Sequence, residues 1–283
     1  MARCSLWWSQ TPRLEGRRVG AIGHYAAADR AAGAALLEAA CDVLARAGSE
    51  VAVGPMDGNT WRNYRLIVDP GTDPTFCLEP SHCEDCLAEF EAARFHRFAG
   101  YRSTVCDNLT ICDPRAMRAH RRLAERGVTM RPLTMDQIDR DMWAMYEVSV
   151  EAFAHAMLYQ PVSQETMKAL YQPLLQRIDP ALVLLAECAG EVVGFAFGLP
   201  DECQAARGEP IDTAILKTLA VHPGRAFAGL GAVLMQRFHD TARRRGMRRV
   251  IHALMHEQNH RILALSARYA RPMRRYALMA RNL

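Results

Sequence analysis

The feature that most constrains the fold is a strand pattern, a glycine-rich turn and a long helical pattern in direct succession. Residues 221–246 read VHPGRAFAGLGAVLMQRFHDTARRRG and follow the apolar run TAILKTLA. A helix that starts at such a turn has unpaired backbone N–H groups at its positive dipole end, and these groups bind phosphate. Gly229 and Gly231 remove the side chains that would keep a pyrophosphate from the backbone, and Arg225 can add a charge-assisted contact. The stretch therefore predicts a site for a phosphorylated cofactor.

The context of the turn makes this prediction more specific. A lone glycine pair at a helix start is more often only a tight turn. Here the run TLAVHP, the turn, the helix, a further strand pattern and the segment MHEQNH follow one another. This succession carries more information than the glycines alone.

Length and composition indicate a globular chain of one or two domains. The chain has 283 residues, of which 50% are hydrophobic and 23% charged. Its start, MARCSLWWSQTPRLEG, lacks the apolar core of a secretory signal, and the most apolar window contains Glu187 and Glu191. We expect two buried strands there, no membrane partner and a cytoplasmic location.

Charge and cysteine content point away from nucleic acid and disulfides. The net charge is +4 and comes almost wholly from arginine, since Lys168 and Lys217 are the only lysines. Nine cysteines without a signal peptide are typical of reduced thiols. The run CLEPSHCEDC has a C-x-x-C beside a histidine, but no second well-spaced pair follows, so we expect a loop with ordinary thiols and no metal site rather than a zinc set. The residues of this run are Cys77, His82, Cys83 and Cys86.

The pattern of elements predicts a mixed α/β sheet with helices on its faces. Asp113 and Pro114 start a helical stretch that runs to Gly127, which we interpret as a connecting helix over 113–128. The order predicted after residue 129 is strand, two helices, three strands, helix, strand, helix and strand.

The first half of the chain is a divergent echo of the second. A shift of 198 positions aligns the long helices, and FEAARFHRFAGY later resembles LSARYARPMRRY. The aligned pairs are Gly48 with Gly246, Gly33 with Gly231, and His24 with His222. We therefore predict a truncated domain over 1–112 that packs against a complete one over 129–283.

These motifs resemble the GNAT superfamily of acyl-CoA-dependent N-acyltransferases, whose signature is V-x-P followed by (Q/R)-x-x-G-x-(G/A). The resemblance covers residues 129–283, and the Q/R position falls on Ala226. It implies that backbone amides of the turn hold the pyrophosphate of coenzyme A, that the preceding strand end pairs with the pantetheine arm, and that an asparagine helps to hold that arm. The residues implied are Leu219, Ala220, Val221, Arg225, Ala226, Phe227, Ala228, Gly229, Leu230, Gly231 and Asn259.

The resemblance also implies candidates for proton transfer. Tyr269 is the counterpart of the family's usual proton donor, although ten residues separate it from Asn259. His252 could relay the proton of the amine, or could be a hydrogen-bonded histidine in a strand. No acid stands where the family often keeps a base, because Ile215 occupies that position. In the amino-terminal half, which looks GNAT-like but degenerate, Glu91 replaces the tyrosine.

Several charged residues stay open alternatives. Glu147, Glu151, Asp201, Glu202 and Asp212 are further acids that could bind a cationic amine. Lys217 lies in an apolar strand, where a salt bridge is the expected explanation. The basic run 243–249 could attract a phosphate or an acyl carrier protein, but is more typical of a solvated helix end.

The sequence thus predicts a tandem α/β protein that transfers an acyl group, expected to be acetyl, from acyl-CoA to the primary amine of a small molecule by direct attack. Two alternatives remain at this point. The donor could be an acyl carrier protein or an aminoacyl donor in specialised metabolism, or the chain could be a non-catalytic module that binds acyl-CoA or a partner. The oligomeric state is open.

Overall fold

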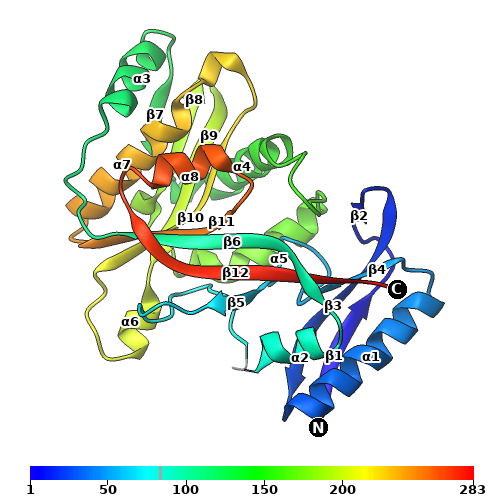
Figure 1. The fold of residues 1–283 in the computed structure, drawn as a ribbon. Helices are drawn as coiled ribbons and strands as arrows, with labels where there is room; N and C mark the ends of the chain where they lie inside the picture. The colour runs from blue at the N-terminus through cyan, green and yellow to red at the C-terminus, as the bar shows by residue number, and fades with distance from the viewer. Residues whose placement is uncertain (83–84) are drawn as a thin grey trace.

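The computed structural model describes residues 1–82 and 85–283 as one continuous mixed sheet with helices on both faces (Figure 1). The strand order is β1-β3-β4-β12-β6-β11-β10-β9-β8-β7, with β2 paired to β3 and β5 paired to β12. The strands are β1 (Ala2–Trp7), β2 (Arg13–Leu14), β3 (Arg17–Ala27), β4 (Val51–Gly54), β5 (Leu66–Asp69), β6 (His96–Cys106), β7 (Thr129–Pro132), β8 (Val183–Cys188), β9 (Glu191–Pro200), β10 (Thr213–Val221), β11 (Arg249–His256) and β12 (Arg271–Asn282). This arrangement confirms the predicted fold class.

The helices follow the predicted order, with one short addition. They are α1 (Arg30–Arg46), α2 (Cys86–Ala92), α3 (Pro114–Ala124), α4 (Ile138–Ala152), α5 (Gln164–Leu175), α6 (Glu202–Ala206), α7 (Leu230–Arg244) and α8 (His260–Ser266). The helix α6, in the connection from β9 to β10, was not predicted. The connecting helix is α3, which Asp113 caps by accepting a hydrogen bond from the amide of Arg115.

The internal repeat is visible in the order of elements. The succession β3-α1-β4-β5-α2-β6 in the first half corresponds to β10-α7-β11-α8-β12 in the second, apart from the additional strand β5. In each half the first two strands are parallel neighbours and a helix connects them. The tandem arrangement read from the sequence is therefore present in space.

The last strand of each half is exchanged with the other half. β6, from the first half, pairs with β11 and β12, while β12, from the second half, pairs with β6 and β4. Figure 1 shows both strands running the length of the molecule between the two groups of helices. The predicted boundary near residue 112 separates the two halves along the sequence. It does not separate two sheets, because the sheet of each half contains a strand of the other.

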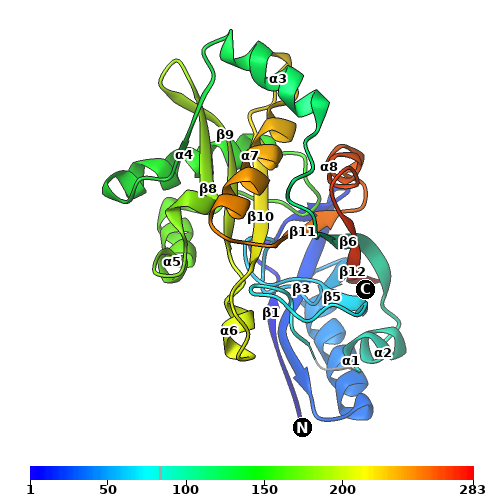
Figure 2. The same cartoon turned by 90° about the vertical axis from the view of Figure 1, so that its left-hand side faces the viewer.

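Helices cover both faces of the carboxy-terminal half and one face of the other (Figures 1 and 2). α3, α7 and α8 pack on one face around the buried side chains of Leu123, Leu234 and Phe238. α4 and α5 lie on the opposite face, and α1 and α2 cover the amino-terminal half. On the uncovered side of that half, Leu158 from the chain after α4 belongs to the same buried cluster as Met56, so the second half supplies part of the first half's core.

No helix in the described ranges combines the length and the apolar character that a bilayer crossing requires.

Candidate active site between β10 and β11

The site begins where the parallel strands β10 and β11 separate. Their ladder joins Thr213–Leu216 to Arg249–His252, and no further pair follows it among the described residues. The register between β10 and β9 shifts at Lys217, which is a β-bulge, and β10 then follows β9 to Val221. A bulge bends and twists its strand, and beyond Leu216 β10 is paired with β9 but not with β11. This unpaired place is called the opening between the two strands.

The glycine-rich turn lies at the end of β10 and leads directly into α7. Gly229 has a φ of 87°, in the left-handed region that glycine adopts without strain, and it is the N-cap residue of α7. Glycine has no side chain to cap the helix. Within the described residues, the backbone amides of Gly229, Leu230 and Gly231 have no hydrogen-bond partner. They are free to bind an anion at the positive end of the helix dipole.

Not every amide of the predicted cradle is free. The amides of Phe227 and Ala228 donate to the carbonyls of Gly224 and Arg225, in a short 3₁₀ turn. The amides available to a ligand are therefore fewer than the sequence suggested, and they gather at the start of α7. Arg225 is exposed beside this turn.

Helix α3 supports the turn from the side away from these amides. A Cβ on Gly229 would lie 2.9 Å from the Cβ of Ala119, so α3 touches the glycine directly. Arg122 donates to the carbonyl of Ala228, and Arg126 donates to that of Ala226 at 3.0 Å. Across a trans peptide the N–H points opposite to the preceding C=O. The amide of Gly229 therefore points away from α3.

The corresponding place in the amino-terminal half is closed. Asp29 caps α1 and accepts a hydrogen bond from the amide of Ala32 at 2.8 Å, so the helix start already holds a carboxylate. The strands β3 and β4 do not part freely, because the amide of Met56 donates to the carbonyl of Ile22 at 2.7 Å. A Cβ on Gly23 would lie 2.3 Å from the Asp57 carboxylate. Of the two related places, the second half keeps the open one.

The run RAAGAA at residues 30–35 also fits the pattern (Q/R)-x-x-G-x-(G/A), but it lies inside α1 and has a packing explanation. A Cβ on Gly33 would lie 2.4 Å from the Tyr25 hydroxyl and 2.8 Å from the carboxyl carbon of Glu89. Glycine is needed there for close packing of these two side chains.

The structure places Tyr269 in the core rather than at the opening. The side chain is 5% exposed, and its hydroxyl donates to Oε1 of Gln236 at 3.1 Å. Burial raises its pKa above the ordinary value of a phenol, and the Asp113 carboxylate adds to the effect. A buried phenol with its proton already donated inside the core is poorly placed to protonate a departing thiolate.

His252 is also part of the core beneath α7. Its Nδ1 contacts the hydroxyl of Ser266 at 2.7 Å, and its Nε2 contacts Nε2 of His239 at 2.8 Å. Burial, with His239 as a second cause, holds the pKa of His252 well below its ordinary value. These contacts match the alternative interpretation of a hydrogen-bonded strand histidine.

Of the remaining predicted residues, three lie in a strand whose backbone has one unpaired edge, and one caps a helix. Leu219, Ala220 and Val221 pair with Ala196, Phe195 and Gly194 of β9, so their other edge faces the opening. Asn259 caps α8 by accepting a hydrogen bond from the amide of Ile262 at 3.3 Å.

Lys217 does not form the salt bridge that the sequence suggested. Among the described residues no carboxylate lies within ion-pair distance of it and no hydrogen-bond partner is present. Burial, helped by the Arg65 guanidinium, lowers the pKa of Lys217 to about 7. Sequence reasoning missed Arg65 altogether, because it lies 152 positions away in a segment with no motif.

The acids that the sequence offered as alternatives pair with other side chains or are exposed. Ile215, at the position of the missing base, is fully buried. Glu151 lies 2.8 Å from Nε2 of His222, and Glu202 pairs with Arg177. Glu147 is exposed on α4, and Asp212 accepts a hydrogen bond from Gln204 at 2.8 Å.

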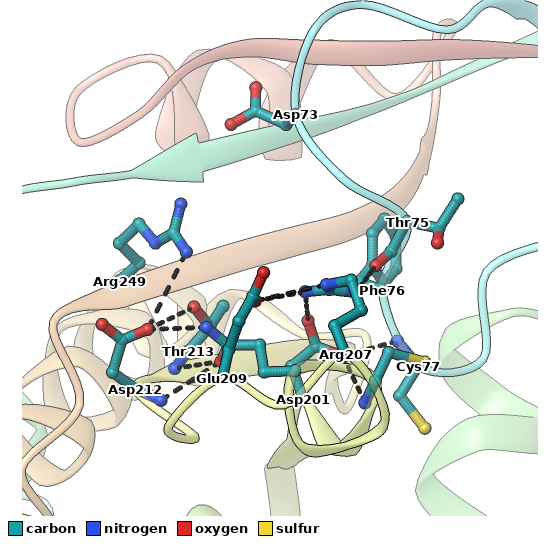
Figure 3. Close-up of polar contacts among 12 residues, drawn as sticks. Asp73, Thr75, Phe76, Cys77, Asp201, Arg207, Glu209, Asp212, Thr213 and Arg249 are labelled. Carbon is teal, nitrogen blue, oxygen red and sulfur yellow. Dashed lines mark hydrogen bonds and ion pairs between the residues drawn. The ribbon is translucent and has the colours of Figure 1, made fainter.

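Asp201 fixes a loop of the first half against the second (Figure 3). Its carboxylate accepts a hydrogen bond from the amide of Cys77 at 2.8 Å, and Arg207 donates to the carbonyl of Thr75 at 2.8 Å. Burial raises the pKa of Asp201 above its ordinary value. These contacts hold residues 73–79 beside β10, where Cys77 and Glu79 influence the pKa of Lys217.

The zinc alternative falls partly outside the described residues, because Cys83 is not described. Within the described ranges no group of three metal-ligating side chains is close enough to hold an ion. The basic run at the end of α7 lies at the surface, where Arg245 pairs with Asp179 at 2.6 Å.

The sequence of residues 141–268 matches the acetyltransferase (GNAT) family. No curated protein matches the chain. Among solved structures, a GCN5-related N-acetyltransferase from Sphaerobacter thermophilus is similar, with a TM-score of 0.56, 17% identity, and 93% of this chain and 73% of that chain covered.

Two further structures are similar over nearly the whole chain. A tandem GNAT protein from the clavulanic acid biosynthesis pathway has a TM-score of 0.51 and 16% identity, with 94% of this chain and 76% of that chain covered. A glucosamine N-acetyltransferase region in a fungal multi-domain β-N-acetylglucosaminidase has a TM-score of 0.60 and 12% identity, with 99% of this chain but 31% of that chain covered. At these identities the likeness concerns the fold alone.

Proposed function

We propose that the protein transfers an acyl group from acyl-CoA, with acetyl-CoA as the expected donor, to the primary amine of a small molecule, since the sequence of residues 141–268 matches the acetyltransferase (GNAT) family. The observation that carries this proposal is the contrast between the two halves. The second half has free amides at the start of α7 beside a strand opening, whereas Asp29 and Met56 close the same place in the first half. Acyl transfer is thereby assigned to the second half.

The start of α7 supports a role in binding the donor's phosphates. The amides of Gly229, Leu230 and Gly231 are the proposed pyrophosphate ligands, with Arg225 as a surface cation nearby. The free backbone edge of Leu219–Val221 is the proposed partner of the pantetheine amides. On this arrangement the thioester reaches the bulge at Lys217, where the strands part.

The reaction follows from the chemistry of a thioester and an amine. The lone pair of the neutral amine attacks the carbonyl carbon, a C–N bond forms and the C–S bond breaks. The sulfur leaves as a thiolate that takes up one proton, and the new ammonium gives up one. We assign neither proton to Tyr269 or His252, because both side chains are buried and hydrogen-bonded away from the opening.

Calorimetric titration with acetyl-CoA tests the donor site. Gly231→Glu places a carboxylate among the free amides, and we expect it to abolish binding. The fold should survive, because Gly231 is the second residue of α7, its Cβ would meet only Leu219 and Val221 at 3.9 Å, and acidic residues suit a helix start.

Ala31→Glu is the matched control, because Ala31 is the exposed second residue of α1 in the first half. It should leave the affinity for acetyl-CoA unchanged. Equal loss of binding in both variants, or wild-type binding by Gly231→Glu, would contradict the assignment of the donor to α7.

A second candidate function is a non-catalytic acyl-CoA-binding module. Its support is the buried Ile215 at the usual position of the base together with the buried Tyr269. A screen of primary amines with free thiol as the readout separates the two functions, since the binding module takes up acetyl-CoA but releases no thiol. An acyl carrier protein as donor remains a further alternative, which charge reversal at Arg244 and Arg248 would test.

A further inference from the structure

Two cationic side chains lie near the end of the β10–β11 ladder without an anionic partner in the described structure: Lys217 directly follows the last pair, and Arg65 donates to Leu254 of β11. Lys217 comes from β10 of the second half, and Arg65 comes from the segment before β5 of the first half. Among the described residues, neither lies within ion-pair distance of a carboxylate. A buried or half-buried cation without a partner costs free energy, so an arrangement of two of them near one another indicates a site for an anion.

Arg65 is fixed in a way that leaves one edge of its guanidinium free. The residue is 4% exposed, and the group lies over the rings of Tyr64 and Tyr101, with its Cζ 3.7 and 4.1 Å from the ring centroids. Its Nη1 donates to the carbonyl of Leu254 on β11 at 3.0 Å. Its Nε is buried and has no partner in the described structure.

The free edge has the shape that a carboxylate binds. Nε and Nη2 of an arginine form a planar fork whose two N–H bonds run parallel, and the two oxygens of a carboxylate accept them together. Because Leu254 occupies Nη1, this fork is the part of Arg65 left for a ligand.

Lys217 adds a second donor from the other strand. It lies at the bulge of β10, immediately beyond the Leu216–His252 pair that ends the ladder with β11. The nearby Glu79 does not neutralise it, since Glu79 pairs with Arg274 at 2.5 Å and accepts a hydrogen bond from Tyr276. The Glu79 side chain is therefore committed to the core.

His256 contributes a third donor near Arg65. Its ring lies 4.8 Å from that of Tyr101, and its Nδ1 accepts a hydrogen bond from the amide of Gln258 at 3.1 Å. Because Nδ1 accepts this hydrogen bond, the ring proton is assigned to Nε2. Burial and Arg65 both lower the pKa of His256. This Nε2 is buried without a partner in the described structure.

We propose that a substrate carboxylate binds between Arg65 and Lys217, with His256 as an additional donor near Arg65. The inference rests on the proposed acyl transfer and specifies the substrate class. It also gives the first half a role, since Arg65 belongs to the half whose own donor site is closed.

The carboxylate has two sources with the same chemistry. It can belong to the acceptor, which is then an amino acid or a related zwitterion. It can also belong to the acyl group of a dicarboxylic acyl-CoA such as succinyl-CoA. In both cases the carboxylate lies near the bulge of β10, and the experiment has one arm for each source.

The first arm compares L-amino acids with the amines formed by their decarboxylation, and the second compares succinyl-CoA with acetyl-CoA. Each compound is assayed by thiol release and separately by calorimetric binding without turnover. A carboxylate held by an arginine fork and a lysine should raise kcat/KM or affinity about tenfold to a hundredfold in one arm, since charged hydrogen bonds contribute roughly 1.5–3 kcal/mol.

Arg65→Met and Lys217→Met should each remove most of this preference while leaving the affinity for acetyl-CoA unchanged. Arg62→Met and Lys168→Met are matched controls on exposed side chains and should keep it. If Arg65→Met fails to fold, Arg65→Lys retains the charge without the fork, and we expect it to lose about tenfold of the preference.

The results separate this inference from the proposed function. Absence of a carboxylate preference in both arms, or a preference that survives Arg65→Met and Lys217→Met, overturns the carboxylate site even if amines are acylated. Failure of acetyl-CoA to bind overturns the proposed function instead. In that case, calorimetric binding of an L-amino acid that both variants abolish would still establish the carboxylate site.

Discussion

At the scale of single residues, the face of the sheet on which a side chain lies decides what it can do. Lys217 and His252 both lie where β10 and β11 begin to part. Lys217 is unpartnered and influenced by loop residues of the first half, whereas His252 is bound to His239 and Ser266 beneath α7. The lysine is therefore available to a ligand, and the histidine belongs to the core.

Replacement of Lys217 by methionine should stabilise the protein without ligand. The apolar side chain removes the cost of an unpartnered amine, roughly 1–3 kcal/mol at neutral pH. The pKa of Lys217 in the folded protein, about 7, lies below its ordinary value of 10.5, so the unfolded chain binds more protons between these two pH values. The stability of the wild type therefore rises with pH across this window. Urea unfolding at pH 7 and pH 10 should show this rise in the wild type and a smaller one in Lys217→Met. An equal rise in both would contradict it.

Tyr269→Phe should affect stability more than chemistry. The hydroxyl donates to Gln236 inside the core, and its loss should cost about 1 kcal/mol. Acetyl-CoA affinity and the rate of thiol release should both stay within about twofold of wild type. A large fall in rate at unchanged affinity would instead restore the catalytic role that the family resemblance implies for Tyr269.

At the scale of elements, capping decides which helix can receive a phosphate. α1 and α7 each follow a strand of the sheet, but the N-cap residue of α1 is Asp29 and that of α7 is Gly229. A carboxylate at the helix start occupies the positive end of the helix dipole. A glycine there leaves this end free to bind a ligand.

The junction of β7 and α4 depends on one buried carboxylate. Asp141 is 1% exposed and lies 2.6 Å from Arg131, which also pairs with Glu187. Burial alone would raise the pKa of Asp141, but the hydrogen bonds from Arg131 outweigh it, and the net pKa is lowered from 3.8. Its stabilisation is therefore present above about pH 4 and is lost as the pH falls further.

Asp141→Asn should lower the free energy of unfolding by about 1–3 kcal/mol at pH 7 and by much less at pH 3. Thermal unfolding of both proteins across this range measures the difference. A pH-independent difference would show that the charge is not its cause. Asp139→Asn is a suitable control, because Asp139 is on the same helix and largely exposed.

At the scale of the whole molecule, strand exchange makes the two halves one unit. β6 and β12 each pair with strands of the other half, and Asp201 holds the loop of Cys77 against the second half. The site draws on both halves as a result, with the free amides in one half and Arg65 in the other.

We expect urea unfolding of the full chain to be one cooperative transition, despite the tandem organisation. Separate fragments 1–112 and 113–283 should lack stable structure on their own, because each loses a central strand of its sheet. Circular dichroism and intrinsic fluorescence should report coincident midpoints for the full chain. Two separated transitions, or a well-folded isolated fragment, would argue against this coupling.

Much of the fold could be predicted because its signals are local. Apolar periodicity, the cap at Asp113 and the glycines of the turn identified the order of elements and the tandem echo. The site was predicted less well, because periodicity shows that Tyr269 and His252 are inward-facing without showing which face of the sheet they occupy. Arg65 had no local signal at all, since its position matters only after its segment is placed against Leu254 of β11.

The sequence by itself determined the α/β class, the family resemblance of the second half and the turn at Gly229, since each depends on neighbouring residues along the chain. Only the tertiary structure decided that the final strands are exchanged, that Asp29 and Met56 close the first half, and that Arg65 of the first half donates to Leu254 of β11. These features depend on contacts between residues far apart in the chain, and such contacts leave no pattern in one sequence.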